Sequence, residues 1–259
     1  MATADSVKTK IQNLIATANE TTGNTDTDLT SAVGSLVEGY GQGGTDSYSD
    51  AFWDAFQDYG NRTDYLSVFN GKYWTNETFK PKHSMHLTSG YQMFKDSILN
   101  LDFADLEEEL GIVFDFSKAT TCTYMLMFAR GITGLNVFDT RSMDGLHYSF
   151  GYAYGLKRIK KLILRDDGSQ TFDGIFLFCY ELEEITSIEG VIGKSISFTD
   201  ASKLNEVTIS LVISKLSNTA TGMTASFSKT AVTNAFGSTE NAELLALINS
   251  KPNWTISIV

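Results

Sequence analysis

A four-position apolar template recurs four times in the middle of the chain, and it restricts the fold more than any other feature. In each copy a large apolar residue is followed, at steps of three, by a small residue and two aliphatic residues. The copies are Leu126-Ala129-Ile132-Leu135, Phe150-Ala153-Leu156-Ile159, Phe176-Cys179-Leu182-Ile185 and Phe198-Ala201-Leu204-Val207. Their first positions lie 24, 26 and 22 residues apart (150−126, 176−150 and 198−176). A degenerate fifth copy near Phe94 has Ser97 at the small position.

Each copy is followed by a short run rich in β-branched or aliphatic residues, which favours a strand. The runs are Val137-Phe138, Leu162-Ile163-Leu164, Ile188 and Ile209-Ser210-Leu211. A period of about 20 to 29 residues with one strand per copy is typical of leucine-rich repeats. One unit cannot bury its apolar face alone, whereas stacked units share a continuous core. The sequence therefore predicts an α/β repeat fold, a leucine-rich-repeat solenoid with one short parallel strand per repeat.

The segments on either side of the repeats divide the chain into four regions. Two apolar stripes at helical spacing, 7–18 and 29–40, predict a two-helix module that ends in a glycine-rich linker. Such short helices need a partner, so we expect this module to oligomerise. The expected regions are an attachment and oligomerisation module at 1–44, an aromatic-rich N-terminal cap at 45–90, the repeat solenoid at 91–215 and a C-terminal cap at 216–259.

Two of these regions leave alternatives open. Residues 48–79 contain ten aromatic residues, including Trp53 and Trp74, and form either a cap over the solenoid core or a carbohydrate-binding platform. The stretch 207–216 fits a strand by composition and a helix by spacing. Near the end of the chain, Leu244 and Leu247 predict a short helix before Pro252, and 254–259 predicts a final strand.

Composition excludes several classes of protein. The net charge of −11 (20 basic against 31 acidic residues) disfavours general nucleic-acid binding. Cys122 and Cys179 form no motif and are expected to be small core residues. The first 20 residues contain no secretory apolar segment, and no apolar run approaches the length of a membrane span. We therefore expect synthesis in the cytoplasm and no membrane insertion.

Several segments resemble a known group of proteins. The pattern Phe-x-x-Cys-x-x-Leu-x-x-Ile at 176–185 resembles the BspA-like leucine-rich-repeat surface proteins. The stretches 52–63, 77–82, 161–169 and 251–256 are similar to leucine-rich-repeat proteins encoded by phages and prophages of gut Firmicutes. The N-terminal stretches 8–12 and 28–33 are similar to the start of tail-fibre-like proteins from the same genomes. The resemblance implies a virion tail protein with an N-terminal attachment module and a distal recognition module, and a homotrimer is the expected assembly.

No constellation of residues indicates catalysis or a cofactor. His83 and His86 have no third ligand nearby in the sequence, so we expect no metal site. The acidic clusters at 105–109, 166–167 and 181–184 invite comparison with glycosidases, but solvated loop and helix-start carboxylates explain them. The basic run 157–165 is expected to balance nearby acids. We therefore expect a binding protein without a cofactor, not an enzyme.

The repeat register itself indicates a binding face. The template leaves one position free before the small residue and one after it, and aromatic side chains occupy many of them. Tyr152, Tyr154 and Tyr180 are the candidates for an exposed ladder, with Arg130 as a planar donor for sugars or phosphate. Trp53 and Trp74 are the second group of candidates. Phe128 and Phe178 either join the ladder or add to the core.

The expected function is host adhesion by a phage tail protein, whose N-terminal helices bind other virion proteins. The repeat face would bind a glycan or protein on the host surface. Two alternatives remain at this point: a virion decoration or baseplate component that contacts only virion proteins, and a polysaccharide-degrading enzyme, which the lack of a convincing acid pair disfavours.

Overall fold

The computed structural model describes residues 69, 71, 73–75, 79, 84–111 and 113–259, all of which belong to the unit Ser49–Val259. The predicted helical module at 1–44 lies outside the described residues. So do most of the aromatic segment, including Trp53, and the first histidine of the pair, His83. The domain boundaries predicted at 44 and 45 therefore stay predictions.

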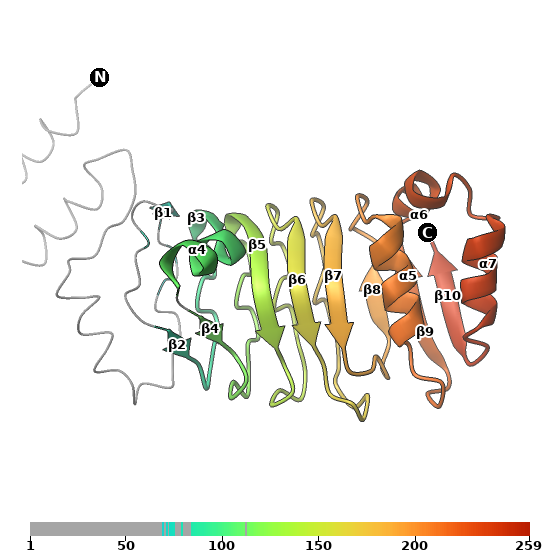
Figure 1. Ribbon diagram of the computed structural model, residues 1–259, viewed down its shortest axis with the longest axis horizontal. Coiled ribbons are helices and arrows are strands. Elements are labelled where there is room, and N and C mark those ends of the chain that lie inside the picture. The colour runs from blue at the N-terminus through green and yellow to red at the C-terminus, as the bar shows by residue number, and fades with distance from the viewer. Residues whose placement is uncertain (1–68, 70, 72, 76–78, 80–83, 112) are drawn as a thin grey trace, which may run out of the picture. The chain divides into compact units, whose positions relative to one another are not determined.

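Parallel strands from successive repeats build the largest sheet. Its order is β1-β3-β5-β6-β7, and β5, β6 and β7 lie side by side in Figure 1. The strands are β1 (Tyr73–Thr75), β3 (Ile98–Asp102), β5 (Arg130–Asp139), β6 (Arg158–Ile163) and β7 (Glu184–Glu189). Leu135, Ile159 and Ile185, the last aliphatic positions of three template copies, stand directly opposite one another. The template thus sets the register, because shifting it by one residue would turn these side chains out of the core.

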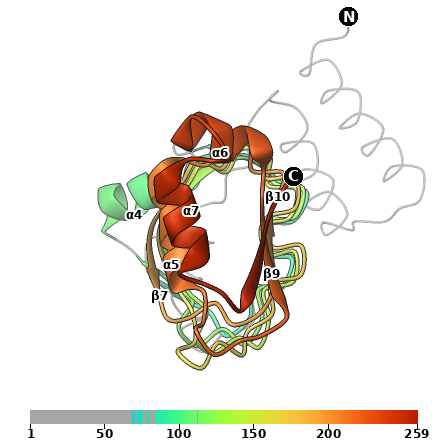
Figure 2. The ribbon, with the colours of Figure 1, turned by 90° about the vertical axis from the view of Figure 1, so that its right-hand side faces the viewer.

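Two smaller parallel sheets complete the strand framework. One has the order β10-β9-β8, with β8 (Ile196–Phe198), β9 (Met223–Phe227) and β10 (Trp254–Ile258). The other pairs β2 (Met85–His86) with β4 (Phe114–Asp115). Viewed from the end, β7 lies on one side of the stack and β9 and β10 on the other (Figure 2). An α/β fold with parallel strands in small sheets is therefore confirmed.

The core between the sheets contains the template residues. The large positions form a row of rings, with centroids 5.8 Å apart for Phe150 and Phe176 and 4.7 Å apart for Phe176 and Phe198. Phe227 extends the row by one ring, 5.7 Å from Phe198. The small positions, including Cys179 and Ser97 of the degenerate copy, are also buried, and so is Cys122. The interpretation of Cys122 and Cys179 as core residues is confirmed.

Four helices lie in the described part of the chain: α4 (Phe103–Leu110), α5 (Glu206–Lys215), α6 (Lys229–Phe236) and α7 (Ala242–Asn249). In α4, the carboxylate of the N-cap residue Asp102 accepts from the amides of Ala104 and Asp105. The short helix and final strand expected before and after Pro252 are α7 and β10. Helix α6 and strand β9 were not predicted.

The fourth template copy ends differently from the prediction. Residues 206–215 form α5, so of the two alternatives left open for 207–216 the helix is confirmed and the strand at Ile209-Ser210-Leu211 is wrong; Val207 is 62% exposed. The side chain of Asn205 accepts from the amide of Thr208 and starts the helix, and this cap outweighs the β-branched composition. The Thr208 hydroxyl in turn accepts from the amide of Ile185, so α5 covers the edge of β7 where a further strand would pair.

Lysine 251 fixes the connection after α5. Its ammonium group is buried and donates to the carbonyl oxygens of Ser214 and Leu216, at 3.0 and 2.6 Å, and to Asn218 Oδ1 at 3.0 Å. The Trp254 indole N–H donates to the Ser217 carbonyl at 2.8 Å. The segment 251–254 therefore supplies the donors that the end of α5 lacks.

None of the helices in the described part is long and apolar enough to cross a membrane.

Candidate functional site

Bulky aromatic residues occupy a strained backbone conformation in the turns that precede the strands. Tyr124, Phe128, Tyr148, Tyr152 and Phe178 have φ values between 49° and 62°. This left-handed region costs an L-residue roughly 1–3 kcal/mol and is uncommon for large side chains. The turns are held by hydrogen bonds to the next repeat, such as Tyr152 N–H to the Leu177 carbonyl at 2.7 Å. The stacked backbones therefore impose the conformation.

The equivalent position in the third repeat shows that an aromatic side chain is not required there by the fold. Tyr124 and Tyr148 lie two residues before the large template position, and in the next repeat this place is taken by Gly174, with φ 62°. Glycine adopts this conformation without the steric cost. The aromatic residues at the other positions thus carry a backbone cost that glycine would avoid.

Five rings form one contiguous cluster, which we call the aromatic ladder: Phe128, Tyr152, Tyr154, Phe178 and Tyr180. The centroid of Tyr152 lies 4.6 Å from that of Phe128 and 4.7 Å from that of Phe178. Tyr154 stacks on Tyr180 at 6.3 Å with an interplanar angle of 12°. Tyr152 meets Tyr154 edge to face, and Phe178 meets Tyr180 at 5.8 Å. These distances are those of favourable aromatic pairs.

The ladder lies at the surface. Tyr180 is 44% exposed, and the other four rings are half-buried. Phe128 and Phe178 are therefore ladder members and not fully buried core residues. The structure brings Tyr152, Tyr154 and Tyr180 together, as expected from the register.

The other predicted binding residues stand apart from the ladder. Arg130 is exposed at the start of β5, and no side-chain contact links it to the ladder within the described part. Arg130 lies in the coil next to that of Tyr154. The evidence is the close approach of Gly131, which follows Arg130, to Gly155, which follows Tyr154. Trp74 lies in β1, opposite Leu99, but its side chain is outside the described part.

A second aromatic row was missed. Tyr124 stacks on Tyr148 at 5.7 Å, and Tyr91 meets Tyr124 at 6.0 Å. The ring of Tyr148 extends over Gly174, where an added Cβ would approach its Cε1 to 2.4 Å. The sequence did contain a signal, since two tyrosines stand 24 residues apart at the same template offset.

Electrostatics keep the exposed hydroxyl of the ladder protonated. Desolvation raises the pKa of Tyr180, and the negative charge of Asp200 raises it further. Asp200 ends the ladder, because its carboxylate accepts from the amide of Phe178 at 2.9 Å. At neutral pH the ladder therefore offers phenol donors together with apolar ring faces.

Most of the basic run is paired with acids from neighbouring repeats, as predicted, and Lys157 is the one member for which no ion pair is found within the described residues. Arg158 pairs with Asp102 and Asp105, and Lys161 pairs with Glu189 at 2.6 Å. Arg165 pairs with Asp144 at 2.8 Å. No large cationic surface results from this run.

One acidic residue departs from the expectation that the carboxylates are solvated. Glu107 is only 6% exposed, and its carboxylate accepts from the amide of Phe114 at 3.0 Å and from the Asn136 side chain. Burial raises the pKa of Glu107, and the two hydrogen bonds partly oppose this effect. The reason is α4, which turns this residue of the cluster inward.

The described residues include no group of three or more His, Cys, Asp or Glu side chains arranged to hold a metal ion. The Nδ1 atom of His86 lies 2.9 Å from the Oδ2 atom of Asp115. Burial raises the pKa of both cysteine thiols, that of Cys179 to about 12. A thiol with so high a pKa is a poor nucleophile at neutral pH.

Comparisons with family models, with curated proteins and with solved structures find no match for this chain.

Proposed function

We propose that this chain is a leucine-rich-repeat protein of a phage virion that binds the host cell surface through the aromatic ladder. The parallel strands from successive template copies, the turns bonded from one repeat to the next and the row of core phenylalanines support a solenoid. The virion setting rests on the sequence resemblance. Attachment through residues 1–44 and assembly as a homotrimer belong to the same proposal.

The observation that carries the proposal is the retention of aromatic residues where glycine would be less strained. Backbone strain persists at sites where function requires it or where packing over-determines the structure. Gly174 shows that the stack accepts glycine at the place of Tyr124 and Tyr148, and the ladder residues Phe128, Tyr152 and Phe178 have the same left-handed conformation. Half-buried rings add little to the core, so ligand contact is the better explanation for their presence.

The chemistry of the ladder fits a saccharide. Tyrosine rings stack on the apolar faces of sugars with little loss of side-chain entropy, and their hydroxyls reach the sugar hydroxyls. Successive rings along the stack are spaced at 4.6 and 4.7 Å, which suits an extended polymer better than a compact ligand. A host-surface glycan is therefore the ligand class that we propose.

Adsorption to cells tests this proposal. The fluorescently labelled protein is mixed with a panel of gut Firmicutes strains, and bound protein is measured by flow cytometry. The triple variant Tyr152→Gly, Tyr154→Ser, Tyr180→Ser should lose at least about tenfold in binding, since each stacked ring contributes on the order of 1 kcal/mol.

The control variant is Thr230→Gly, Thr233→Ser, Ser238→Gly, which changes three exposed residues of the C-terminal region. It should bind like the unmodified protein. Adsorption of the ladder variant at the unmodified level would exclude the ladder as the recognition surface.

A further inference from the structure

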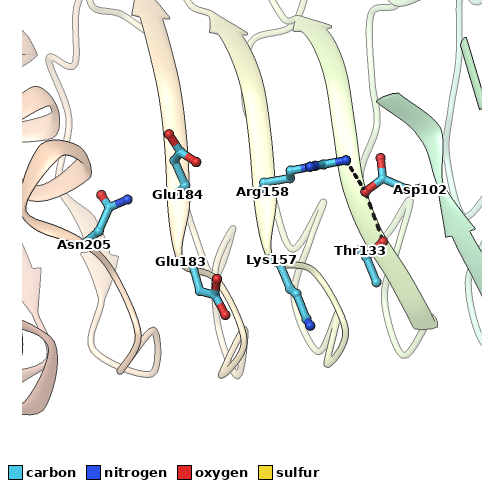
Figure 3. Close-up of a pocket in the computed structure, with 7 residues that line it drawn as sticks. All are labelled: Asp102, Thr133, Lys157, Arg158, Glu183, Glu184 and Asn205. Carbon is cyan, nitrogen blue, oxygen red and sulfur yellow. Dashed lines mark hydrogen bonds and ion pairs between the residues drawn. The ribbon is translucent and has the colours of Figure 1, made fainter. Parts of the chain in front are cut away.

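A polar pocket lies beside the starts of the central strands, away from the ladder rings. Its volume is about 400 Å³, and Figure 3 shows the side chains that line it. They are Asp102, Thr133, Lys157, Arg158, Glu183, Glu184 and Asn205. The volume is in the range of sites that hold small molecules.

The backbone register brings these residues together from five segments of the chain. Arg158 stands opposite Glu184 in the pairing of β6 and β7, and opposite Gly134 in the pairing of β5 and β6. Asn205 donates its backbone N–H to the Glu183 carbonyl at 2.9 Å. The N-terminal ends of α4 and α5, capped by Asp102 and Asn205, therefore lie at opposite ends of the row of residues that line the pocket.

One end of the pocket is already neutralised. Asp102 accepts from the Thr133 hydroxyl at 3.1 Å, pairs with Arg158 at 3.0 Å and caps α4. Gly134 makes room for this carboxylate, because an added Cβ would lie 2.4 Å from its oxygens. Arg158 Nε nevertheless remains buried without a hydrogen-bond partner in the described part. A buried donor of this kind is costly unless a ligand or water supplies an acceptor.

The rest of the pocket carries charges of both signs that are not paired with each other. Within the described residues, no ion pair involves Lys157, Glu183 or Glu184. In Figure 3 the side chains of Lys157 and Glu183 extend in the same direction from neighbouring strands, and Glu184 extends in the other direction. The pocket thus presents one ammonium group and two carboxylates to a ligand.

We propose that this pocket binds an amino sugar that also carries an anionic group. The ligand's ammonium group would pair with Glu184, and its anionic group would pair with Lys157. Ring hydroxyls would contact the exposed part of the Arg158 side chain and the Asn205 amide nitrogen, for which no partner is found in the described part. A hexosamine ring with a phosphate fits the volume and satisfies both signs of charge, whereas a purely anionic ligand would face two carboxylates.

Isothermal titration calorimetry of the full chain tests the pocket with three probes. These are glucosamine 6-phosphate, glucosamine, which lacks the anion, and N-acetylglucosamine 6-phosphate, which lacks the ammonium group. Glucosamine 6-phosphate should bind most tightly, and each of the other two about fivefold or more weakly, the loss expected for one partly exposed ion pair. Equal affinity for all three, or binding of none, would overturn the proposal.

Two variants separate the two charge contacts. Glu184→Gln should remove the preference over the N-acetylated sugar and keep the preference for phosphate, and Lys157→Gln should do the reverse. The exposed controls Glu240→Gln and Lys194→Gln should change neither preference. Thermal unfolding confirms that each variant folds, and Glu184→Ala replaces Glu184→Gln if the latter does not. Preferences that survive in both pocket variants would exclude the site.

The ladder variant distinguishes this proposal from the proposed function. Tyr152→Gly, Tyr154→Ser, Tyr180→Ser should bind glucosamine 6-phosphate with unchanged affinity, because the pocket uses none of these rings. If this variant loses the probe while Lys157→Gln retains it, the sugar binds on the ladder and the pocket assignment is wrong.

Discussion

Glu107 is a carboxylate held in an apolar setting at the end of α4. A neighbouring interior space is lined by Phe94, Phe103 and Phe114, among others. Because burial raises its pKa above the ordinary value of 4.5, the folded state binds the proton more tightly than the unfolded state. The stability that this protonation contributes is fully present below the unfolded pKa and is lost as the pH rises through the folded pKa.

Glu107→Gln should therefore raise the melting temperature at about pH 8 and change it little at about pH 4, where the carboxyl group is largely protonated. The glutamine carbonyl can still accept from the Phe114 amide. Differential scanning calorimetry of both proteins at the two pH values measures this. If Glu107→Gln instead lowers the melting temperature relative to the unmodified protein, and lowers it more at about pH 8 than at about pH 4, the hydrogen bonds of the charged carboxylate outweigh its desolvation.

Burial destabilises the charged form of Glu107, whereas the charged form of Lys251 is stabilised by hydrogen bonds to three oxygen atoms. Burial lowers its pKa, so desolvation offsets part of the gain. Lys251→Met should still lower the free energy of unfolding by about 2–3 kcal/mol, because one buried and two part-buried acceptors lose their donor. Urea denaturation measures the change. The exposed Lys229→Met is the control, expected within about 0.5 kcal/mol of the unmodified protein; similar values for both variants would refute the capping role.

At the scale of elements, the stack depends on close backbone approach between neighbouring repeats. An added Cβ at Gly155 would lie 2.8 Å from the Gly131 nitrogen and 2.9 Å from its Cα. Neither backbone atom can move without shifting β5, so Gly155→Ala should cost about 1–3 kcal/mol.

The matched control for this substitution is Gly222→Ala. Gly222 has φ 68° and nothing within 4 Å of an added Cβ, so only backbone strain of about 1 kcal/mol is expected. Denaturant unfolding of both variants compares the two effects. A smaller loss of unfolding free energy in Gly155→Ala than in Gly222→Ala would mean that the repeats are not packed this closely.

The elements differ in how well the sequence predicts them. The template predicts the register of β5, β6 and β7, because each strand buries the last aliphatic position of its own copy. The strands begin within the copies and not after them, so each starts earlier than predicted. It fails at Val207, where one side-chain cap at Asn205 converts the expected strand into α5. Strand β9 and helix α6 were missed because the period fades after Phe198, although Phe227 still occupies a large core position.

The candidate site was predictable only in part. The register groups Tyr152, Tyr154 and Tyr180, since equivalent positions of stacked repeats lie side by side. It does not reveal that Tyr152 and Phe178 have positive φ, because no local sequence rule places a bulky aromatic residue there. The charged pocket was missed because its seven residues come from separate segments, and β-sheet register alone brings them together.

For the full chain, we propose that the predicted module at 1–44 supplies assembly and that the remaining chain supplies recognition. Removing residues 1–44 should reduce the molar mass in solution from that of a trimer to that of a monomer and leave the melting temperature of the remainder unchanged. Light scattering after size exclusion and thermal unfolding measure the two quantities. A truncated chain that does not fold would show that these residues belong to the solenoid core.

We propose that the strained aromatic turns form the surface that binds the host cell. Hydrogen–deuterium exchange, followed by mass spectrometry with and without purified cell-wall polysaccharide from an adsorbing strain, locates the contact directly. We expect the polysaccharide to slow the exchange of backbone amides in peptides covering 124–130, 148–154 and 174–180, with little change in α6 and α7. Protection confined to other segments, with these three turns unaffected, would contradict it.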